Sequence, residues 1–206
     1  MISGIEFSTA TSEGVSLHIL GYNIDIYNKK LIAMCEHIRE KRDERNAKLL
    51  IALNEEGYKL SPEDLIFHNN QDFIGKPTFA LAMTKKGYIE KPADAFRDVF
   101  STEKMRAIKK EKISEKTAID IISDAGGTAV LAHPGLIHHI GQRGSEEFYS
   151  NLDKILKKLR REGLAGLECY YSKHSQDEEN RFLKLAKKNH LTITQGSDYH
   201  GPDMER

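Results

Sequence analysis

A short apolar segment, Gly127-Thr128-Ala129-Val130-Leu131-Ala132-His133-Pro134-Gly135, sets the architecture of this 206-residue chain. Its small and β-branched residues predict a buried strand, and Pro134-Gly135 ends any regular structure. His133 is therefore expected at the carboxyl end of a buried strand, which is where catalytic groups gather in parallel α/β proteins. A hydrogen-bonded structural histidine at a strand end is the alternative interpretation.

The segment belongs to an alternation of helices and strands. Helical spacing of apolar residues predicts helices over 114–125, 146–161 and 176–189. Apolar runs predict two further strands, over 164–171 and 191–195. Short links between such elements are typical of parallel βα units with right-handed crossovers, so the expected fold class is α/β.

The N-terminal residues predict two more strands, over 2–8 and 15–22. Ser12-Glu13-Gly14 between them has turn composition, which indicates a hairpin. Glu6 lies on the first of these strands and His18 on the second. We expect these two side chains to face each other across the pair.

A block of different character separates this hairpin from the βα units. Its predicted helices cover 28–58, 77–86 and 92–100, and it contains no convincing strand. We therefore expect residues 28–112 to form an inserted helical subdomain. Residues 1–27 and 113–206 would then form one discontinuous domain.

Composition narrows the class of protein. Lys plus Arg and Asp plus Glu both number 31, so the net charge is zero, which argues against stable binding of duplex DNA. Two cysteines do not make a disulfide scaffold and favour a reducing compartment, the cytoplasm. No apolar run approaches ~18 residues, so a membrane-spanning helix is not expected, and the first residues do not lead us to expect a secretory signal.

Polar groups follow three successive predicted strands. The first strand ends at His133, the second at Tyr170-Tyr171-Ser172-Lys173-His174, and the third at Gly196-Ser197-Asp198-Tyr199-His200-Gly201. Because the carboxyl ends of parallel strands share one rim, these groups should meet. Asp198 and His200 are two residues apart, so on an extended segment they would point to the same side.

These side chains are the types that bind divalent metals. The predicted ligands are Glu6, His18, His133, Asp198 and His200. A carboxylate such as Glu6 would bridge two ions ~4 Å apart, which activate a water and hold the oxygens of a phosphoester. Coincidental placement of polar residues at strand ends is the competing interpretation.

The motifs resemble, in order, those of PHP (polymerase and histidinol phosphatase) domain metal-dependent phosphoesterases. The matching segments are Gly4-Ile5-Glu6-Phe7-Ser8, His18-Ile19-Leu20-Gly21-Tyr22, Ala132-His133-Pro134-Gly135, Gly166-Leu167-Glu168-Cys169-Tyr170-Tyr171 with His174, and Gly196-Ser197-Asp198-Tyr199-His200-Gly201. The most similar branch has a helical insertion and includes nucleotide 3′,5′-bisphosphate phosphatases and 5′–3′ exoribonucleases. The resemblance covers essentially the whole chain. It implies a distorted (β/α)7 barrel with up to three divalent ions, usually manganese, with zinc or iron as alternatives.

The resemblance also implies roles for the ligands. Glu6 matches the bridging carboxylate, and His18 and His133 match ligands of the same metal. Asp198 matches the ligand opposite, and His200 the ligand of the third metal. The residues implied in catalysis are Glu6, His133, Asp198 and His200.

Two further positions resemble groups that contact the substrate phosphate, His174 and Lys76. The family usually has Arg where Lys76 stands and His where Thr78 stands. Arg binds a phosphate through two nitrogens and Lys through one, so the substrate geometry would differ. An ordinary surface lysine is the alternative interpretation of Lys76.

The chain lacks the first metal-binding motifs of the family. The family opens with a His-x-His strand, an acidic residue and another histidine, and none of these can be placed here. We therefore expect an incomplete barrel, truncated at both ends. A separate segment that carries the missing N-terminal strands would then be a partner of the chain.

The implied function is metal-dependent hydrolysis of a small phosphorylated nucleotide (a 3′,5′-bisphosphate) or of the 5′ end of short RNA, by metal-activated water. The alternatives are a catalytically incomplete metal-binding fragment of such an enzyme and a phosphatase of the histidinol-phosphate type. A third alternative is a nucleic-acid-binding helical module in 28–112, but no helix-turn-helix signature supports it.

Overall fold

The computed structural model describes residues 2–67 and 74–199, and the chain divides into two compact units. One unit comprises Met1–Ala33 and Lys112–Arg206, and the other comprises Met34–Glu111. The identification of these units as a discontinuous barrel domain, 1–27 with 113–206, and an inserted subdomain, 28–112, stays a prediction.

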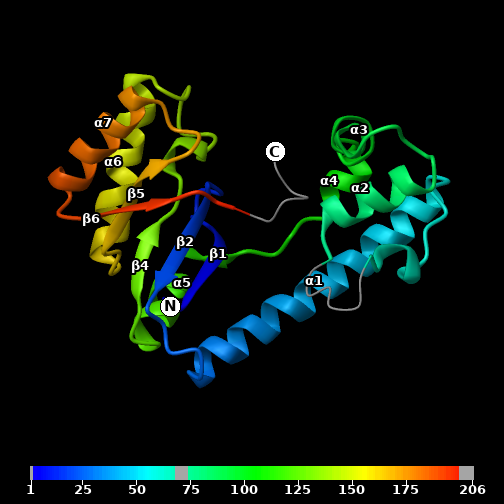
Figure 1. The fold of residues 1–206 in the computed structure, drawn as a ribbon, viewed down its shortest axis with the longest axis horizontal. Coiled ribbons are helices and arrows are strands. Elements are labelled where there is room, and N and C mark those ends of the chain that lie inside the picture. The colour runs from blue at the N-terminus through cyan, green and yellow to red at the C-terminus, as the bar shows by residue number, and fades with distance from the viewer. Residues whose placement is uncertain (1, 68–73, 200–206) are drawn as a thin grey trace. The chain divides into compact units, whose positions relative to one another are not determined.

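The first unit is built on a six-stranded mixed sheet (Figure 1). Its strands are β1 (Gly4–Ala10), β2 (Ser16–Tyr22), β3 (Ile113–Ser114), β4 (Thr128–Leu131), β5 (Gly166–Tyr171) and β6 (Thr192–Gly196), in the spatial order β3-β1-β2-β4-β5-β6. β1 and β2 form the predicted antiparallel hairpin, and β2 is antiparallel to β4. β4, β5 and β6 are parallel, which confirms the α/β class. Within the described residues the sheet is open, with β3 and β6 at its edges.

The two faces of this sheet differ. Along β2, Leu17 and Ile19 are fully buried, whereas His18 and Leu20 are half-buried. Helix α5 (Glu115–Asp124) packs on β1, β2 and β4, and α7 (Gln176–Lys188) packs on β5 and β6, with α6 (Glu146–Arg161) beside it. Since side chains alternate along a strand, the residues that do not face these helices line the opposite, accessible face.

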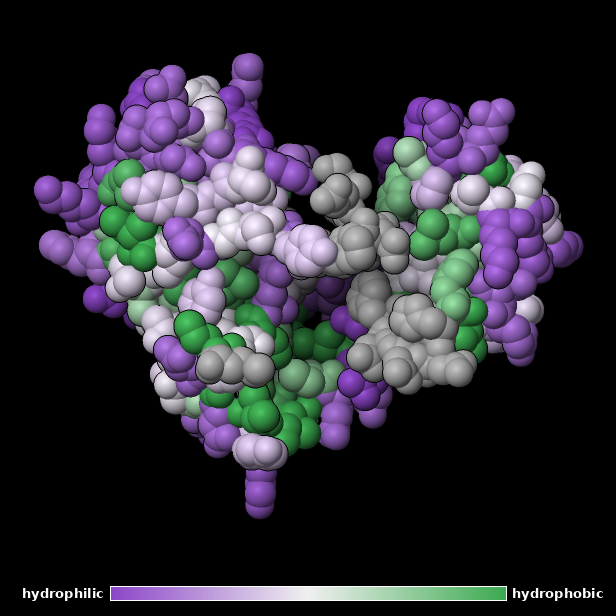
Figure 2. Space-filling view, viewed as in Figure 1, coloured by the Kyte–Doolittle hydropathy of each residue, from purple (hydrophilic) through white to green (hydrophobic). Residues whose placement is uncertain are grey.

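Each of these helices begins with a serine cap. Ser114, Ser145 and Ser175 accept a hydrogen bond from a backbone N–H in the first turn of α5, α6 and α7. Such a cap contributes about 1 kcal/mol and fixes the residue at which the helix begins. The outer sides of α6 and α7 carry hydrophilic side chains (Figure 2), as expected for a solvated face.

The second unit is helical throughout its described residues. It contains most of α1 (Lys29–Glu55), then η1 (Pro62–Leu65), α2 (Lys76–Lys85), α3 (Pro92–Asp94), η2 (Ala95–Val99) and α4 (Glu103–Ala107). Its core includes Leu49, Leu53, Phe79, Met83 and Met105. The helix predicted over 92–100 is split, because a single π-helical turn follows α3. No helix among the described residues is long and apolar enough to cross a membrane.

A partly buried ion pair joins the loop before α6 to the start of α7, and it makes stability depend on pH. Arg143 Nε donates to Glu178 Oε1 at 2.5 Å, which lowers the pKa of Glu178 from 4.5 to about 2. Because the folded pKa lies below the unfolded value, this stabilisation is present above pH ~4.5 and is lost as the pH falls through ~2. Glu178→Gln should therefore reduce the free energy of unfolding by roughly 1–3 kcal/mol at neutral pH.

Urea unfolding of both proteins at neutral pH and near pH 3 checks this expectation, and the difference between them should shrink in acid. The control is Glu146→Gln, whose carboxylate pairs with Arg181 on the surface and is 78% exposed. An equal effect of Glu178→Gln at both pH values would contradict the assignment.

Candidate metal centre

Three side chains converge on the accessible face of the sheet. His18 Nδ1 lies 2.8 Å from Glu6 Oε1, and His133 Nε2 lies 3.3 Å from the same oxygen. The two ring nitrogens are 3.2 Å apart. Each residue thus offers one ligand atom to a common point, as the sequence led us to expect for these three.

Strand register places the first two. Ser8 pairs with His18 and Glu6 pairs with Leu20, so Glu6 and His18 are diagonal neighbours on one face of the hairpin. His133 arrives from the neighbouring strand, because it follows β4 by two residues. The hairpin and the first parallel strand together therefore build the cluster.

The charges in the cluster support one another. Hydrogen bonds from His133 and His18 lower the pKa of Glu6 far below its ordinary value. Burial by itself would lower the pKa of His133, but the hydrogen bond and charge of Glu6 outweigh burial and raise it. The carboxylate is thus ionised, and a positive charge beside it is stabilised.

This arrangement fits a divalent metal. One carboxylate and two imidazoles are a donor set that zinc, manganese and iron accept. Two ring nitrogens 3.2 Å apart that face one carboxylate oxygen need at least one N–H proton among the three atoms, and a metal ion can take the place of such a proton. In the part of the chain that the structure describes, this is the group in which three such ligand atoms lie within 4.8 Å of one another.

The two histidine rings are held differently. His18 Nε2 lies 3.3 Å from Ser8 Oγ. When a metal ion takes the place of the proton on Nδ1, donation from Nε2 to Ser8 would leave the Nδ1 lone pair of His18 pointing into the cluster. His133 Nδ1 is buried and has no hydrogen-bond partner among the described residues. The sequence indicated Ser8 only as part of a motif, because the exact register of the hairpin, which places Ser8 opposite His18, was not predicted.

Asp198 lies at the edge of this site. It lines a cavity of about 360 Å³ together with Glu6, His18 and His133, and Tyr171 donates to its Oδ2 at 3.4 Å. The expected extended geometry is wrong here: Asp198 has a φ of 51°, so the backbone turns and strand-like alternation does not apply. His200 lies outside the described residues, and its role stays a prediction.

The same cavity contains a residue that sequence reasoning missed. His138 lies on its wall, in the loop that follows His133-Pro134. Its side chain is exposed, unlike the buried His133. The signal was present in the His138-His139 pair shortly after a strand-end histidine, but consecutive histidines in a loop have no periodicity to indicate their direction.

His174 is tied to the backbone through both ring nitrogens. Nδ1 donates to the carbonyl oxygen of Cys169 at 3.0 Å, and Nε2 accepts from the N–H of Gly135 at 3.2 Å. Burial lowers the pKa of His174, so the neutral ring that this pattern needs is favoured. The ring therefore joins the end of β5 to the turn after His133, and its role toward substrate stays a prediction.

Lys76 belongs to the helical unit, where it is the first residue of α2. Its ammonium nitrogen lies 5.2 Å from the centre of the Phe100 ring. Burial, and then the charge of Arg45, lower the pKa of Lys76. Its predicted contact with a substrate phosphate stays a prediction.

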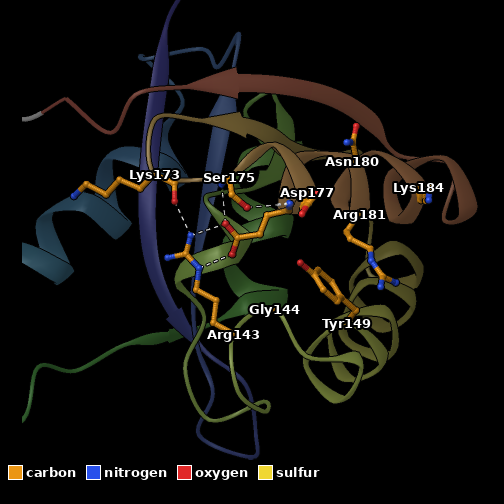
Figure 3. Close-up of a pocket in the computed structure, with 10 residues that line it drawn as sticks. Arg143, Gly144, Tyr149, Lys173, Ser175, Asp177, Asn180, Arg181 and Lys184 are labelled. Atoms are coloured by element: carbon orange, nitrogen blue, oxygen red, sulfur yellow. Dashed lines mark hydrogen bonds and ion pairs between the residues drawn. The ribbon is translucent and has the colours of Figure 1, made fainter.

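A larger cavity, of about 860 Å³, lies between the loop before α6 and helix α7 (Figure 3). Its two guanidinium groups are already paired, Arg143 with Glu178 and Arg181 with Glu146. It contains none of the three clustered ligands. The candidate site is therefore the smaller cavity, where the chemistry converges.

Curated proteins similar to this chain carry names of phosphoester hydrolases. A phosphoribosyl 1,2-cyclic phosphate 1,2-diphosphodiesterase from Eggerthella lenta is 30% identical over 212 residues, which are 98% of this chain and 73% of the relative. The chain belongs to the PHP family of metal-dependent phosphoesterases. No family model matches it.

Two further relatives of this PHP chain differ in their names. The 5′–3′ exoribonuclease Rnm from Escherichia coli (strain K12) is 30% identical over 210 residues, covering 98% of this chain and 66% of that protein. A 3′,5′-nucleoside bisphosphate phosphatase from Chromobacterium violaceum is 26% identical over 202 residues, covering 98% and 68%. The chain thus spans about two thirds of the length of these relatives.

Solved structures confirm the fold class. A chain described as a metal-dependent phosphoesterase from Bifidobacterium adolescentis matches with a TM-score of 0.78 at 28% identity, over 97% of this chain and 68% of that one. An amidohydrolase from Chromobacterium violaceum, with bound sulfate and no metal, matches with a TM-score of 0.80 at 26% identity, over 98% and 68%. The PHP resemblance inferred from the motifs is confirmed.

The Ser8 contact generates a test. Ser8→Ala removes the acceptor for His18 Nε2, so the ring loses the partner that favours its Nδ1 lone pair. Loss of such a partner lowers metal affinity by about 10- to 100-fold. Calorimetric titration with Mn²⁺ measures the change, with Ser16→Ala as control, a serine on the same face of β2. Unchanged affinity in Ser8→Ala would contradict the assigned tautomer.

Proposed function

We propose that this chain provides the metal-binding face of a phosphoesterase that hydrolyses a nucleotide 3′,5′-bisphosphate or the 5′ end of a short RNA. The observation that carries the proposal is the convergence of Glu6, His18 and His133 on one point. The names of the bisphosphate phosphatase and the exoribonucleases support the substrate class.

The chain's own residues have distinct tasks in this proposal. Glu6 supplies the negative charge that holds a divalent ion, and the neutral rings of His18 and His133 complete one side of its coordination. A bound ion of this kind acidifies a water molecule toward a pKa of ~7. Manganese is the proposed ion, with zinc and iron as alternatives.

The remaining candidates complete the proposal. Asp198, on the wall of the same cavity, and His200 are proposed as ligands of further ions and, with Glu6 and His133, as the catalytic set. His174 and Lys76 are proposed to contact the substrate phosphate. We also propose a cytoplasmic location, since both cysteines are free.

The number of candidate ligands favours one bound metal ion in this chain alone. Glu6, His18 and His133 give one ion three protein ligands, whereas any further ion would share Glu6 and add Asp198 or His200. A single imidazole does not hold a divalent ion against water. We therefore propose that the chain alone is a weak hydrolase. The alternative proposal, a catalytically incomplete metal-binding fragment, is consistent with the same ligand count.

Metal titration tests the site. Calorimetry of the purified chain with Mn²⁺ should give about one tight site, and His133→Ala should abolish it. The control is His37→Ala, because His37 belongs to the helical unit and pairs with Glu111 near the surface. Equal binding by His133→Ala and the unaltered chain would refute the site.

A substrate panel tests the reaction. We expect slow release of phosphate from a 3′,5′-bisphosphate nucleotide by the chain with Mn²⁺. Activity should rise when the His-x-His segment of a PHP relative is fused to its N-terminus. In the fused protein His133→Ala should reduce the rate by orders of magnitude. Short 5′-phosphorylated RNA, a cyclic phosphate and histidinol phosphate separate the substrate classes, and full activity in His133→Ala would overturn the proposal.

A further inference from the structure

A second carboxylate lies beside the cluster without being one of its ligands. Glu168, in β5, is 3% exposed. The register pairs Leu20 of β2 with Val130 of β4, and Val130 with Gly166 of β5. Glu168 follows Gly166 by two residues, so its side chain lies on the same face of the sheet as Glu6.

Both oxygens of this carboxylate face the backbone. Oε2 accepts the N–H of His133 at 2.7 Å in a buried hydrogen bond. Oε1 lies directly over Gly196, so close that a Cβ on that residue would overlap it. Glu168 therefore contacts the main chain of a ligand and directs no oxygen to the point where the three ligand atoms meet.

The backbone of His133 needs such support. Its φ of 24° and ψ of 63° lie in the left-handed region, which costs a residue with a side chain of order 1–3 kcal/mol. Strained residues persist only where the surrounding structure holds them. The N–H of His133 donates its hydrogen bond to Glu168.

The ring of His133 meets Glu6 and His18 through Nε2, but among the described residues nothing anchors its second nitrogen. His18 is fixed through Ser8 at its second ring nitrogen, as metal-binding histidines usually are. The second nitrogen of His133 has no hydrogen-bond partner among the described residues. The direction of the His133 ring therefore relies more on its backbone than that of His18 does, and Glu168 is the side chain that holds the N–H of this backbone.

Gly196, on the neighbouring strand β6, also indicates that the position of the Glu168 carboxylate matters. Its φ is not positive, so no backbone strain requires glycine at this position. What requires glycine is space, since any side chain would displace the Glu168 carboxylate. β6 thus leaves room for the group that holds His133.

We propose that Glu168 is a positioning residue of the metal centre. By accepting the His133 N–H, its carboxylate holds the strained turn and aims His133 Nε2 at Glu6 and His18. This inference rests on the proposed function for the identity of the ion, but the hydrogen bond and its effect on His133 exist in the metal-free chain.

The first test compares substitutions of Glu168 itself. Glu168→Gln keeps an oxygen that accepts the His133 N–H, and Glu168→Ala removes it. Calorimetric titration with Mn²⁺ should show affinity about 10- to 100-fold weaker in Glu168→Ala and only a few-fold weaker in Glu168→Gln. Equal, severe losses in both variants would overturn the proposal, because Glu168 would then act as a charge or as a ligand.

The second test leaves Glu168 intact. Gly196→Ala should displace the carboxylate and weaken Mn²⁺ binding as Glu168→Ala does. The matched control is Gly166→Ala, which crowds Val130 and the carbonyl of Thr192 on the same face and does not touch Glu168. This pair keeps the test informative if Glu168→Ala fails to fold. Equal Mn²⁺ affinity in the two glycine variants would overturn the proposal.

A metal-free readout separates this inference from the proposed function. The His133 amide proton, held by a buried carboxylate, should resonate far downfield in ¹H–¹⁵N NMR spectra and exchange slowly. Both features should be lost in Glu168→Ala and in Gly196→Ala and kept in Gly166→Ala. If the unaltered chain binds no Mn²⁺, the proposed function fails, and this signal alone supports or overturns the role of Glu168. An unchanged His133 amide in Glu168→Ala would overturn it.

Discussion

The contact between Glu6 and His133 is the constraint on which the site depends. These residues are far apart in the sequence, and they meet because β2 lies between the hairpin partner β1 and the parallel strand β4. An error of one residue in the register of β1 and β2 would turn Glu6 to the helical face. The buried residues of that face, such as Phe7 and Ile19, prevent such a slip. Hydrophobic packing on one side thus fixes the chemistry on the other.

The fold class could be predicted from the sequence, because the fold class depends on local patterns of apolar residues. The hairpin pattern predicted that Glu6 and His18 face each other, and the turn at Pro134-Gly135 predicted that His133 ends a strand. Ser8, Glu168 and the left-handed turn at Asp198 were not predicted. Ser8 and Glu168 act through contacts across strands, and the φ of Asp198 follows from tertiary surroundings. Periodicity contains no information on such contacts.

The relatives of this chain share an architecture but differ in the names of their substrates. A fold of this kind hosts several activities because the sheet holds the metal ligands while the surrounding loops select the substrate. In this chain the candidate ligands Glu6 and His18 lie on strands, whereas His138 lies on a loop of the same cavity. In this chain the sheet therefore carries two of the candidate ligands, and a loop supplies part of the cavity wall.

The turn after β4 is held from β5 at two points. Glu168 accepts the N–H of His133 and His174 accepts the N–H of Gly135, while Pro134 between them has none to offer. A turn fastened in this way cannot order until the two parallel strands have paired, and such non-local pairing comes late in folding. The position of His133 is thereby coupled to the pairing of β4 with β5, so the candidate metal site and the parallel part of the sheet should form together.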